Sequence, residues 1–180
     1  MKTYIALFRG INVGATRSLP MKELVTILES LGFQKVKTYI QSGNVVLQHE
    51  EEDTTRLAGQ ISTEIKKTRG FEPHVLLLTP NELKKAMAGN PFSEAESKPE
   101  TLHLGFLASK PSNPDLNKLK IIKKDNERFL LKGTVFYLHA PDGVGRSKLA
   151  ASTEKLLGVP MTDRNWRTVC KIRDMVKEIE

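Results

Sequence analysis

The chain has 180 residues, of which 39% are hydrophobic and 27% charged, and its 28 Lys and Arg against 21 Asp and Glu give a formal net charge of +7. This balance is ordinary for a folded globular protein, so we do not expect a disordered chain. The length suffices for one large domain or for two small domains of about 90 residues, each with a modest core.

The start of the chain and its cysteine content bear on cellular location. The apolar run that follows Lys2 is interrupted at Arg9 and is too short for a signal peptide or a membrane span. The single cysteine, Cys170, excludes an internal disulfide and is typical of a reducing compartment. We therefore expect a cytoplasmic protein that does not bind a membrane.

The first half of the chain predicts six elements in the order β-α-β-β-α-β. Residues 3–8 are apolar, aromatic and β-branched throughout, which is typical of a strand buried on both faces. Asp53 is expected to cap the second helix, and Gly70 lies beyond its end. The expected elements are a strand at 3–8, a helix within 18–32, two strands within 36–48 joined by a turn at 42–44, a helix after Asp53, and a strand at 74–79.

The second half repeats this order and adds a helix. The expected elements are a strand at 102–108, a helix begun by Asn113 and Pro114, a hairpin at 128–139, a helix that ends at Gly158, a short strand at 160–165 and a final helix that carries Trp166. An offset of 90 residues aligns several residues of the two halves, which indicates a duplication. The aligned pairs are Gly43 with Gly133, Val45 with Val135, His49 with His139, and Tyr39 with Phe129.

Both halves match the ferredoxin-like unit of β-α-β-β-α-β elements. We predict an α+β protein with two tandem ferredoxin-like subdomains, the first at residues 1–88 and the second, with the extra C-terminal helix, at residues 101–180. Residues 89–100 contain two prolines and three acidic residues and predict a linker or surface loop.

The stretch HAPDGVGRSKLA, residues 139–150, places two glycines before Arg146, Ser147 and Lys148 at a predicted helix start. It lacks the residue order of a P-loop and of the dinucleotide-binding glycine motif. Unpaired N–H groups at a helix start beside basic side chains still favour an anion. We expect one of the glycines to have a backbone conformation closed to other residues and the three residues after them to form the first helical turn. The alternative is a plain strand-to-helix turn.

Two motifs at strand ends offer further hydrogen-bond donors. In RGINVG, Arg9 and Asn12 flank Gly10 and can point at a shared ligand, or Asn12 can fold the loop through its own side chain. In DRNW, Arg164 and Asn165 can recognise a phosphate ester or a base, whereas the following tryptophan is expected in the core. The hairpin turn at 42–44 adds donors of the same kind.

These polar residues all fall at predicted strand ends, hairpin tips or helix starts, and their donors outnumber their carboxylates. If the two halves share one site, Arg9, Asn12 and Asn44 should lie near Arg146 or Arg164. The predicted ligand-binding residues are Arg9, Asn12, Ser42, Asn44, Asp142, Arg146, Ser147, Lys148, Arg164 and Asn165.

Motifs for other chemistry are absent. The four histidines are widely spaced and no Cys-x-x-Cys occurs, so we expect no dedicated metal site, and no cofactor is indicated. An RNA-binding ferredoxin-like fold needs exposed aromatic residues on its central strands. Only Phe136 and Tyr137 are available for this, and one of them must face inward.

Five segments of the chain together resemble the bacterial family of domains of unknown function numbered sixteen ninety-seven. They are FRGINVG (8–14), TYIQSGNVV (38–46), NPF (90–92), LHAPDGVGRSKL (138–149) and TDRNWRTV (162–169). The resemblance implies an α+β fold of two ferredoxin-like subdomains and implies no activity. The chain departs from the family at Ala15, where a second glycine is usual after Gly14, and at Arg167, where a small polar residue is common.

The residues favour a cytoplasmic binding protein for a phosphate-bearing partner, either a nucleotide-like small molecule or a nucleic acid. One alternative is an enzyme that acts on an anionic substrate, with Asp142 as general acid or base. Another is a non-catalytic interaction module whose loops are merely well capped. The oligomeric state and the identity of the ligand are left open.

Overall fold

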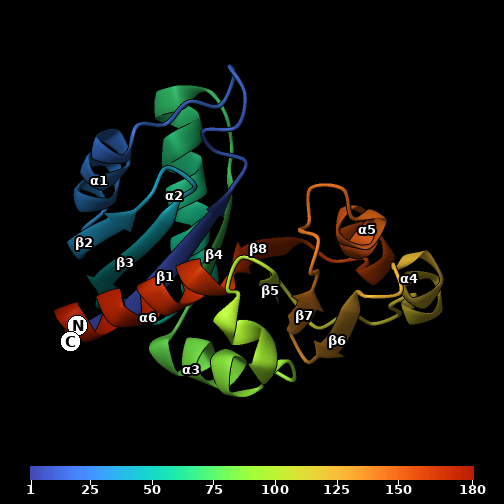
Figure 1. Cartoon of the computed structure of the whole chain (residues 1–180). Helices are drawn as coiled ribbons and strands as arrows, with labels where there is room; N and C mark the ends of the chain where they lie inside the picture. Colours follow the sequence, from blue (N-terminus) through green and yellow to red (C-terminus); the bar gives the residue numbers. More distant parts are fainter. The chain divides into compact units, whose positions relative to one another are not determined.

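The computed structural model describes all 180 residues and divides them into two compact units (Figure 1). The first unit comprises Met1–Lys84 and Lys171–Glu180, and the second comprises Lys85–Cys170. The sequence assigned the whole terminal helix to the second half. In the structure, the last ten residues of the chain group with the first unit instead.

The first unit has a four-stranded antiparallel sheet and two helices in the expected order. Its elements are β1 (Lys2–Arg9), α1 (Met21–Ser30), β2 (Gln34–Tyr39), β3 (Asn44–His49), α2 (Thr54–Arg69) and β4 (His74–Leu78). The strands lie in the order β2-β3-β1-β4. Asp53 caps α2 by accepting a hydrogen bond from the Arg56 N–H, and Gly70 ends that helix in the left-handed conformation, as predicted.

The core of the first unit lies between the sheet and the helices α1 and α2. Alternate side chains of β1 and β3 join this cluster, which includes Tyr4, Ala6 and Leu47. The intervening side chains, such as Ile5 and Val46, point to the other face and are fully buried too. β1 is therefore buried on both faces, which confirms the interpretation of its continuous apolar run.

The end of the last helix, α6 (Trp166–Ile179), contacts that other face of the first sheet. The Ile179 carbonyl accepts hydrogen bonds from the Gln48 amide at 3.3 Å and from the Lys35 ammonium at 3.0 Å. The carbonyls of a final helical turn have no partner within the helix, so these donors satisfy one of them.

The predicted hairpin between β2 and β3 is confirmed, but its turn lies at residues 40–43 and not 42–44, because Asn44 already belongs to β3 and pairs with Tyr39. Gly43 has a φ of +82°, and a Cβ atom added there would lie 2.5 Å from the Phe8 Cβ atom. Only glycine fits this turn, because both the backbone conformation and the contact with β1 exclude a side chain.

The second unit has a second four-stranded antiparallel sheet with the strand order β6-β7-β5-β8. Its elements follow α3 (Pro80–Ala88) and the short 3₁₀ helix η1 (Ser93–Ser97), and they are β5 (Leu102–Leu107), α4 (Leu116–Ile122), β6 (Arg128–Lys132), β7 (Val135–His139), α5 (Lys148–Leu157) and β8 (Met161–Asn165). Leu119, Phe136, Leu138 and Leu149 belong to the core cluster of this unit. The predicted hairpin and the short last strand are confirmed.

Three local expectations for this half were wrong in part. The expected loop at 89–100 contains η1 and buries Phe92 and Ala95. α4 starts after Asp115, whose carboxylate caps the Lys118 N–H, so the true cap lies beyond the Asn-Pro pair. α5 starts at Lys148 with Ser147 as its cap, so Arg146 precedes the helix.

Candidate functional site

The loop after β1 is closed by the side chain of Asn12. Its amide nitrogen donates to the Leu19 carbonyl at 2.9 Å and to the Gln41 carbonyl at 2.8 Å, and its amide oxygen accepts from the Leu19 N–H at 2.7 Å. Its φ of +53° is a conformation that asparagine tolerates better than most residues. Of the two roles considered for Asn12, the observed contacts are those of loop folding.

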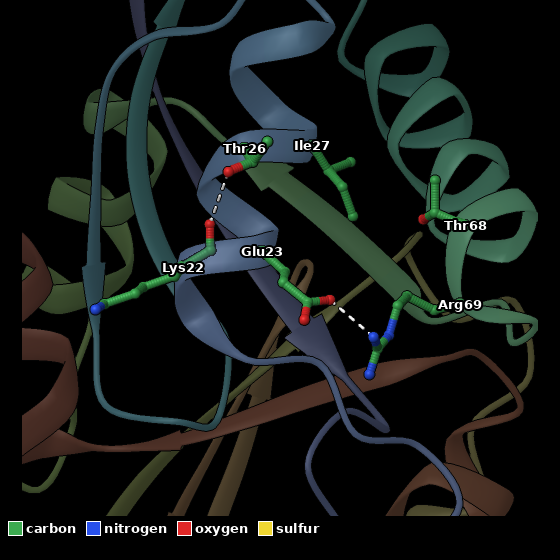
Figure 2. A pocket seen from close by; sticks show the side chains of 6 residues that line it. All are labelled: Lys22, Glu23, Thr26, Ile27, Thr68 and Arg69. Atoms are coloured by element: carbon green, nitrogen blue, oxygen red, sulfur yellow. Dashed lines mark hydrogen bonds and ion pairs between the residues drawn. The ribbon is translucent and has the colours of Figure 1, made fainter.

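Arg69, the last residue of α2, ties this loop to α1. Its Nε and Nη2 atoms donate to the Ser18 carbonyl at 3.3 and 2.8 Å, and its Nη1 atom donates to the Glu23 carboxylate at 2.8 Å. Figure 2 shows the Glu23 carboxylate on α1 turned toward the guanidinium at the end of α2. These bonds use three of the five guanidinium N–H groups, which leaves two for a ligand.

Two cavities lie beside Arg69 and share Thr68 and Arg69 in their walls. One, of about 330 Å³, lies between α1 and α2 and is drawn in Figure 2. It is lined by Lys22, Glu23, Thr26, Ile27, Thr68 and Arg69. The other, of about 290 Å³, which we call the cavity under the loop, is open to solvent, because five of its six lining residues are exposed. It is lined by Ala15, Thr16, Ser18, Thr68, Arg69 and Phe71.

The cavity under the loop has the chemistry of an anion site. Its wall contains the Arg69 guanidinium and three hydroxyl groups, and no carboxylate. The Thr68 hydroxyl donates to the Glu64 carbonyl, whereas the hydroxyls of Thr16 and Ser18 make no hydrogen bond within the protein. A guanidinium with hydroxyl donors around it is a common arrangement for binding phosphate oxygens.

The other predicted residues of the first unit lie apart from these cavities. Arg9 is exposed at the end of β1. Burial of His74 lowers the pKa of its imidazole, and the positive charge of Arg9 lowers that pKa further. Asn44 is fully buried and donates to the Tyr39 carbonyl and the Ser42 hydroxyl. The contacts of Ser42 and Asn44 stabilise the hairpin turn, and a ligand-binding role for them stays a prediction.

The predicted helix-start motif of the second unit is only partly as expected. Gly143 has a φ of +84°, which confirms the expected glycine conformation. The Ser147 hydroxyl accepts from the Ala150 N–H at 3.0 Å, and Arg146 and Lys148 are exposed. Asp142 is exposed too and accepts a hydrogen bond from Asn126. Asp142 and the two basic residues line neither of the cavities beside Arg69.

β8 and the start of α6 hold the remaining predicted residues. The Asn165 side chain accepts from the Thr168 N–H at 3.0 Å and so caps α6, and Trp166 is buried as expected. Burial lowers the pKa of the Arg164 guanidinium to about 10, against the effect of the Asp163 charge. The expected convergence of Arg9, Asn12 and Asn44 with Arg146 or Arg164 joins residues of different units and stays a prediction.

The sequence reasoning missed the residues that line the cavity under the loop. Arg69 stands directly before a helix-ending glycine, a position typical of a basic residue that interacts with the helix dipole. Thr16 and Ser18 belong to no recognised motif. The one available signal was that the loop follows a buried strand, where sites often occur.

Several features bear on other functions. Phe136 and Tyr137 are both buried, and the Tyr137 hydroxyl donates to the Ala86 carbonyl, so neither residue offers a stacking surface for a base. No group of three or more His, Cys, Asp or Glu residues is placed to hold a metal ion. The longest helices are too short or too polar to cross a membrane.

Comparison with known proteins places the chain among proteins without an assigned activity. The structure of conserved bacterial protein SP0830 from Streptococcus pneumoniae superposes with a TM-score of 0.65 at 25% sequence identity, and the match covers 97% of this chain and 98% of that one. No curated protein sequence matches the chain. The model of the family described as "Protein of unknown function (DUF1697)" matches residues 1–137, so the chain belongs to that family.

Proposed function

We propose that the protein binds a small phosphate-bearing molecule and that the phosphate lies in the cavity under the loop beside Arg69. The observation that carries this proposal is the wall of that cavity, which combines a guanidinium with three hydroxyl groups and contains no carboxylate. A ligand phosphate would accept from the two remaining guanidinium N–H groups and from the hydroxyls of Thr16 and Ser18.

The ion pair between Arg69 and Glu23 does not oppose this binding strongly. Both side chains are partly exposed, and exposed pairs contribute about 0–1 kcal/mol. A phosphate carries more negative charge than one carboxylate and offers more acceptor oxygens. It can therefore bind beside Glu23 or replace it at the guanidinium.

The experiment is a titration of the whole protein with inorganic phosphate, followed by ³¹P NMR. We expect Arg69→Gln to weaken binding at least about tenfold, the equivalent of one lost charge-assisted hydrogen bond. Arg56→Gln is the matched control, because Arg56 is an exposed arginine on the same helix that also pairs with a glutamate, Glu51, yet lines neither cavity. It should leave phosphate binding unchanged.

A second variant separates binding from loop folding, because Arg69 also holds the Ser18 carbonyl. Thr16→Val with Ser18→Ala removes two hydroxyls that make no hydrogen bond in the protein. This double variant should keep the circular dichroism spectrum and weaken phosphate binding. Equal phosphate binding by wild type and both variants, or none by the wild type, would contradict the proposal and favour the interaction module.

Binding rather than catalysis is the function that these residues support. A general acid or base must lie within hydrogen-bond reach of its substrate, and no carboxylate or histidine lines the cavity under the loop. Asp142, on which the alternative of an enzyme rests, lines neither of the cavities beside Arg69. The cytoplasmic location expected from the sequence stays a prediction.

We also infer that each unit is a ferredoxin-like domain. The β-α-β-β-α-β element order and the antiparallel strand order, in which the first strand lies between the third and the fourth, occur in both units. The shared order supports the duplication that the 90-residue offset predicted.

A further inference from the structure

We infer that a second cavity, between α5 and the sheet of the second unit, binds a flat heteroaromatic amine. The cavity has a volume of about 300 Å³, which is the lower end of the range for small-molecule sites. It is distinct from the proposed phosphate site, and binding of one ligand does not require the other.

The wall of this cavity formed by the sheet consists of apolar side chains, and the wall formed by the helix consists of residues with small side chains. Phe136 and Leu138 of β7 and Met161 of β8 contribute the apolar wall. Ala150 and Ala151 of α5, with Gly145 in the preceding loop, leave the space open because their side chains are small or absent. An aromatic ring and a thioether sulfur attract the edge or face of a flat ring.

Two polar groups in the wall have hydrogen-bonding capacity that the protein does not use. Asp163 accepts from His103 through Oδ2 at 2.7 Å, and its Oδ1 atom has no donor within the protein. The Ser147 oxygen accepts from the Ala150 N–H, but the hydroxyl proton has no acceptor. The third polar residue, Thr153, donates to the Leu149 carbonyl and is satisfied.

The pair of unused groups selects the ligand class. Asp163 offers an acceptor and Ser147 a donor, so the complementary ligand has an N–H donor and an acceptor on one edge. An amino group next to a ring nitrogen has this pattern, and the apolar wall favours a ring without charge. A ring with no donor would leave the carboxylate oxygen without a partner after its water is displaced, which costs binding free energy.

His103 acts as a positioning residue beneath Asp163. It is 7% exposed, and its second ring nitrogen lies 3.2 Å from the Glu100 carbonyl. With an acceptor at each ring nitrogen, the charged imidazole can donate to both. The bond to His103 therefore engages Oδ2 of the carboxylate and leaves Oδ1 for the ligand.

The test compares adenine, which has an amino group beside a ring nitrogen, with purine, which lacks the amino group, both as their 9-methyl derivatives so that the purine ring has no N–H donor. Chemical-shift changes of the whole protein in ¹H–¹⁵N NMR are followed for both. We expect adenine to bind at least about tenfold more tightly than purine, because a hydrogen bond to a charged group is involved. The shifts should centre on residues 136–138, 144–151 and 161–163. Equal affinity for the two rings, or shifts elsewhere, would overturn the inference.

Two variants make the test specific to this cavity. Asp163→Asn should abolish the preference for adenine, whereas Asp125→Asn, the same change at an exposed aspartate of the same unit, should keep it. Loss of Asp163 also leaves His103 without its partner and can therefore affect the fold. A second variant, Ala150→Leu, tests the cavity while it keeps the pair of Asp163 and His103. It fills the cavity and should block adenine, while Lys155→Leu on the exposed side of α5 should not. Adenine binding unaffected by Ala150→Leu would contradict the site.

Adenine contains no phosphate, so its binding tests this cavity alone. Failure of the Arg69 proposal would appear as unchanged inorganic phosphate binding in Arg69→Gln, and failure here would appear as equal binding of adenine and purine.

Discussion

At the residue scale, one amide side chain closes the loop that forms part of the wall of the proposed phosphate site. Asn12 joins the start of the loop to its end at Leu19 and to the neighbouring hairpin at Gln41. The backbone N–H of Asn12 also donates to the Arg17 carbonyl at 2.7 Å. The side chain and the backbone N–H of Asn12 therefore hold the loop in shape. The hydroxyls of Thr16 and Ser18 are not used for this and are available for a ligand.

Replacing Asn12 with alanine should lower the free energy of unfolding by about 3 kcal/mol. Three side-chain hydrogen bonds are lost at roughly 1 kcal/mol each, and alanine is less tolerant of the positive φ. Asn117→Ala is the control, because Asn117 is exposed on α4 and makes no side-chain hydrogen bond, and it should change stability by less than about 0.5 kcal/mol. Urea unfolding measures both, and equal effects would show that the loop contacts do not contribute.

A second residue-scale prediction concerns the titration of His103. Burial lowers its pKa, but the hydrogen bond and charge of Asp163, with the Glu100 carbonyl, outweigh burial and raise the pKa above 6.5. Because the folded pKa is above the unfolded one, this pair stabilises the fold fully below about pH 6.5, and the effect is lost as pH rises through the folded pKa. NMR titration should give a pKa above 6.5 in wild type and a lower pKa in Asp163→Asn, where only the Glu100 carbonyl still opposes the effect of burial.

The measurement of the free energy of unfolding must separate His103 from His74. The pKa of His74 is shifted in the opposite direction, so it changes stability with pH in the opposite sense. Burial and the charge of Arg9 lower the pKa of His74, so its contribution is lost as pH falls. The difference in unfolding free energy between wild type and Asp163→Asn isolates the pair. It should shrink from pH 6 to pH 9, and a difference that grows over this range would contradict the assignment.

At the element scale, helix α2 contains two glycines whose environments differ. Gly59 lies in the middle of the helix on its solvent-exposed side, and Gly70 ends the helix with a φ of +79°. A Cβ atom added at either position would meet no atom within 4 Å. The two positions therefore differ only in backbone conformation.

The same substitution should have opposite effects at these two positions. Gly59→Ala should raise the free energy of unfolding by about 0.5–1 kcal/mol, since alanine is the better helix former. Gly70→Ala should lower it by about 1–2 kcal/mol, since the left-handed conformation is strained for alanine. Thermal and urea unfolding of the two variants test this, and a change of the same sign in both would refute the role of the helix end.

The sequence predicted most elements because their signals are local. The cap at Asp53, the stop at Gly158 and the unbroken apolar run of β1 depend on the backbone and burial of a few neighbouring residues. α3 was missed because residues 80–88 lie between a strand and a proline-containing segment and show no long apolar stripe. The cap of α4 was misplaced because Asn113 and Asp115 are both good cap residues.

The candidate sites were harder to predict because they depend on contacts across the sequence. Arg69 meets Ser18 from 51 residues away, and Asp163 meets His103 from 60 residues away. Neither pair belongs to a spaced motif, so a pattern search cannot find them. The polar residues that the sequence did single out, such as Asn12, Asn44 and Asn165, mostly cap and close loops.

At the scale of the whole molecule, the terminal helix is divided between the two units. Trp166 and Val169 belong to the second unit, whereas Ile172 and Ile179 belong to the first, and all four are buried. The sequence pattern showed an amphipathic helix but not this division, because periodicity does not tell which core an apolar face joins.

Two substitutions on this helix should affect different units. Val169→Ala removes a fully buried side chain from the second unit, and Ile172→Ala removes one that is 1% exposed from the first. Each should cost about 2–4 kcal/mol through lost burial and the cavity left behind. Hydrogen exchange with mass spectrometry should then show faster exchange mainly in β1 and β3 for Ile172→Ala and mainly in β5 and β7 for Val169→Ala, because amides exchange through opening of their own cooperative unit. If either variant accelerates exchange equally in both sheets, the units unfold together, and the helix joins them into one cooperative structure.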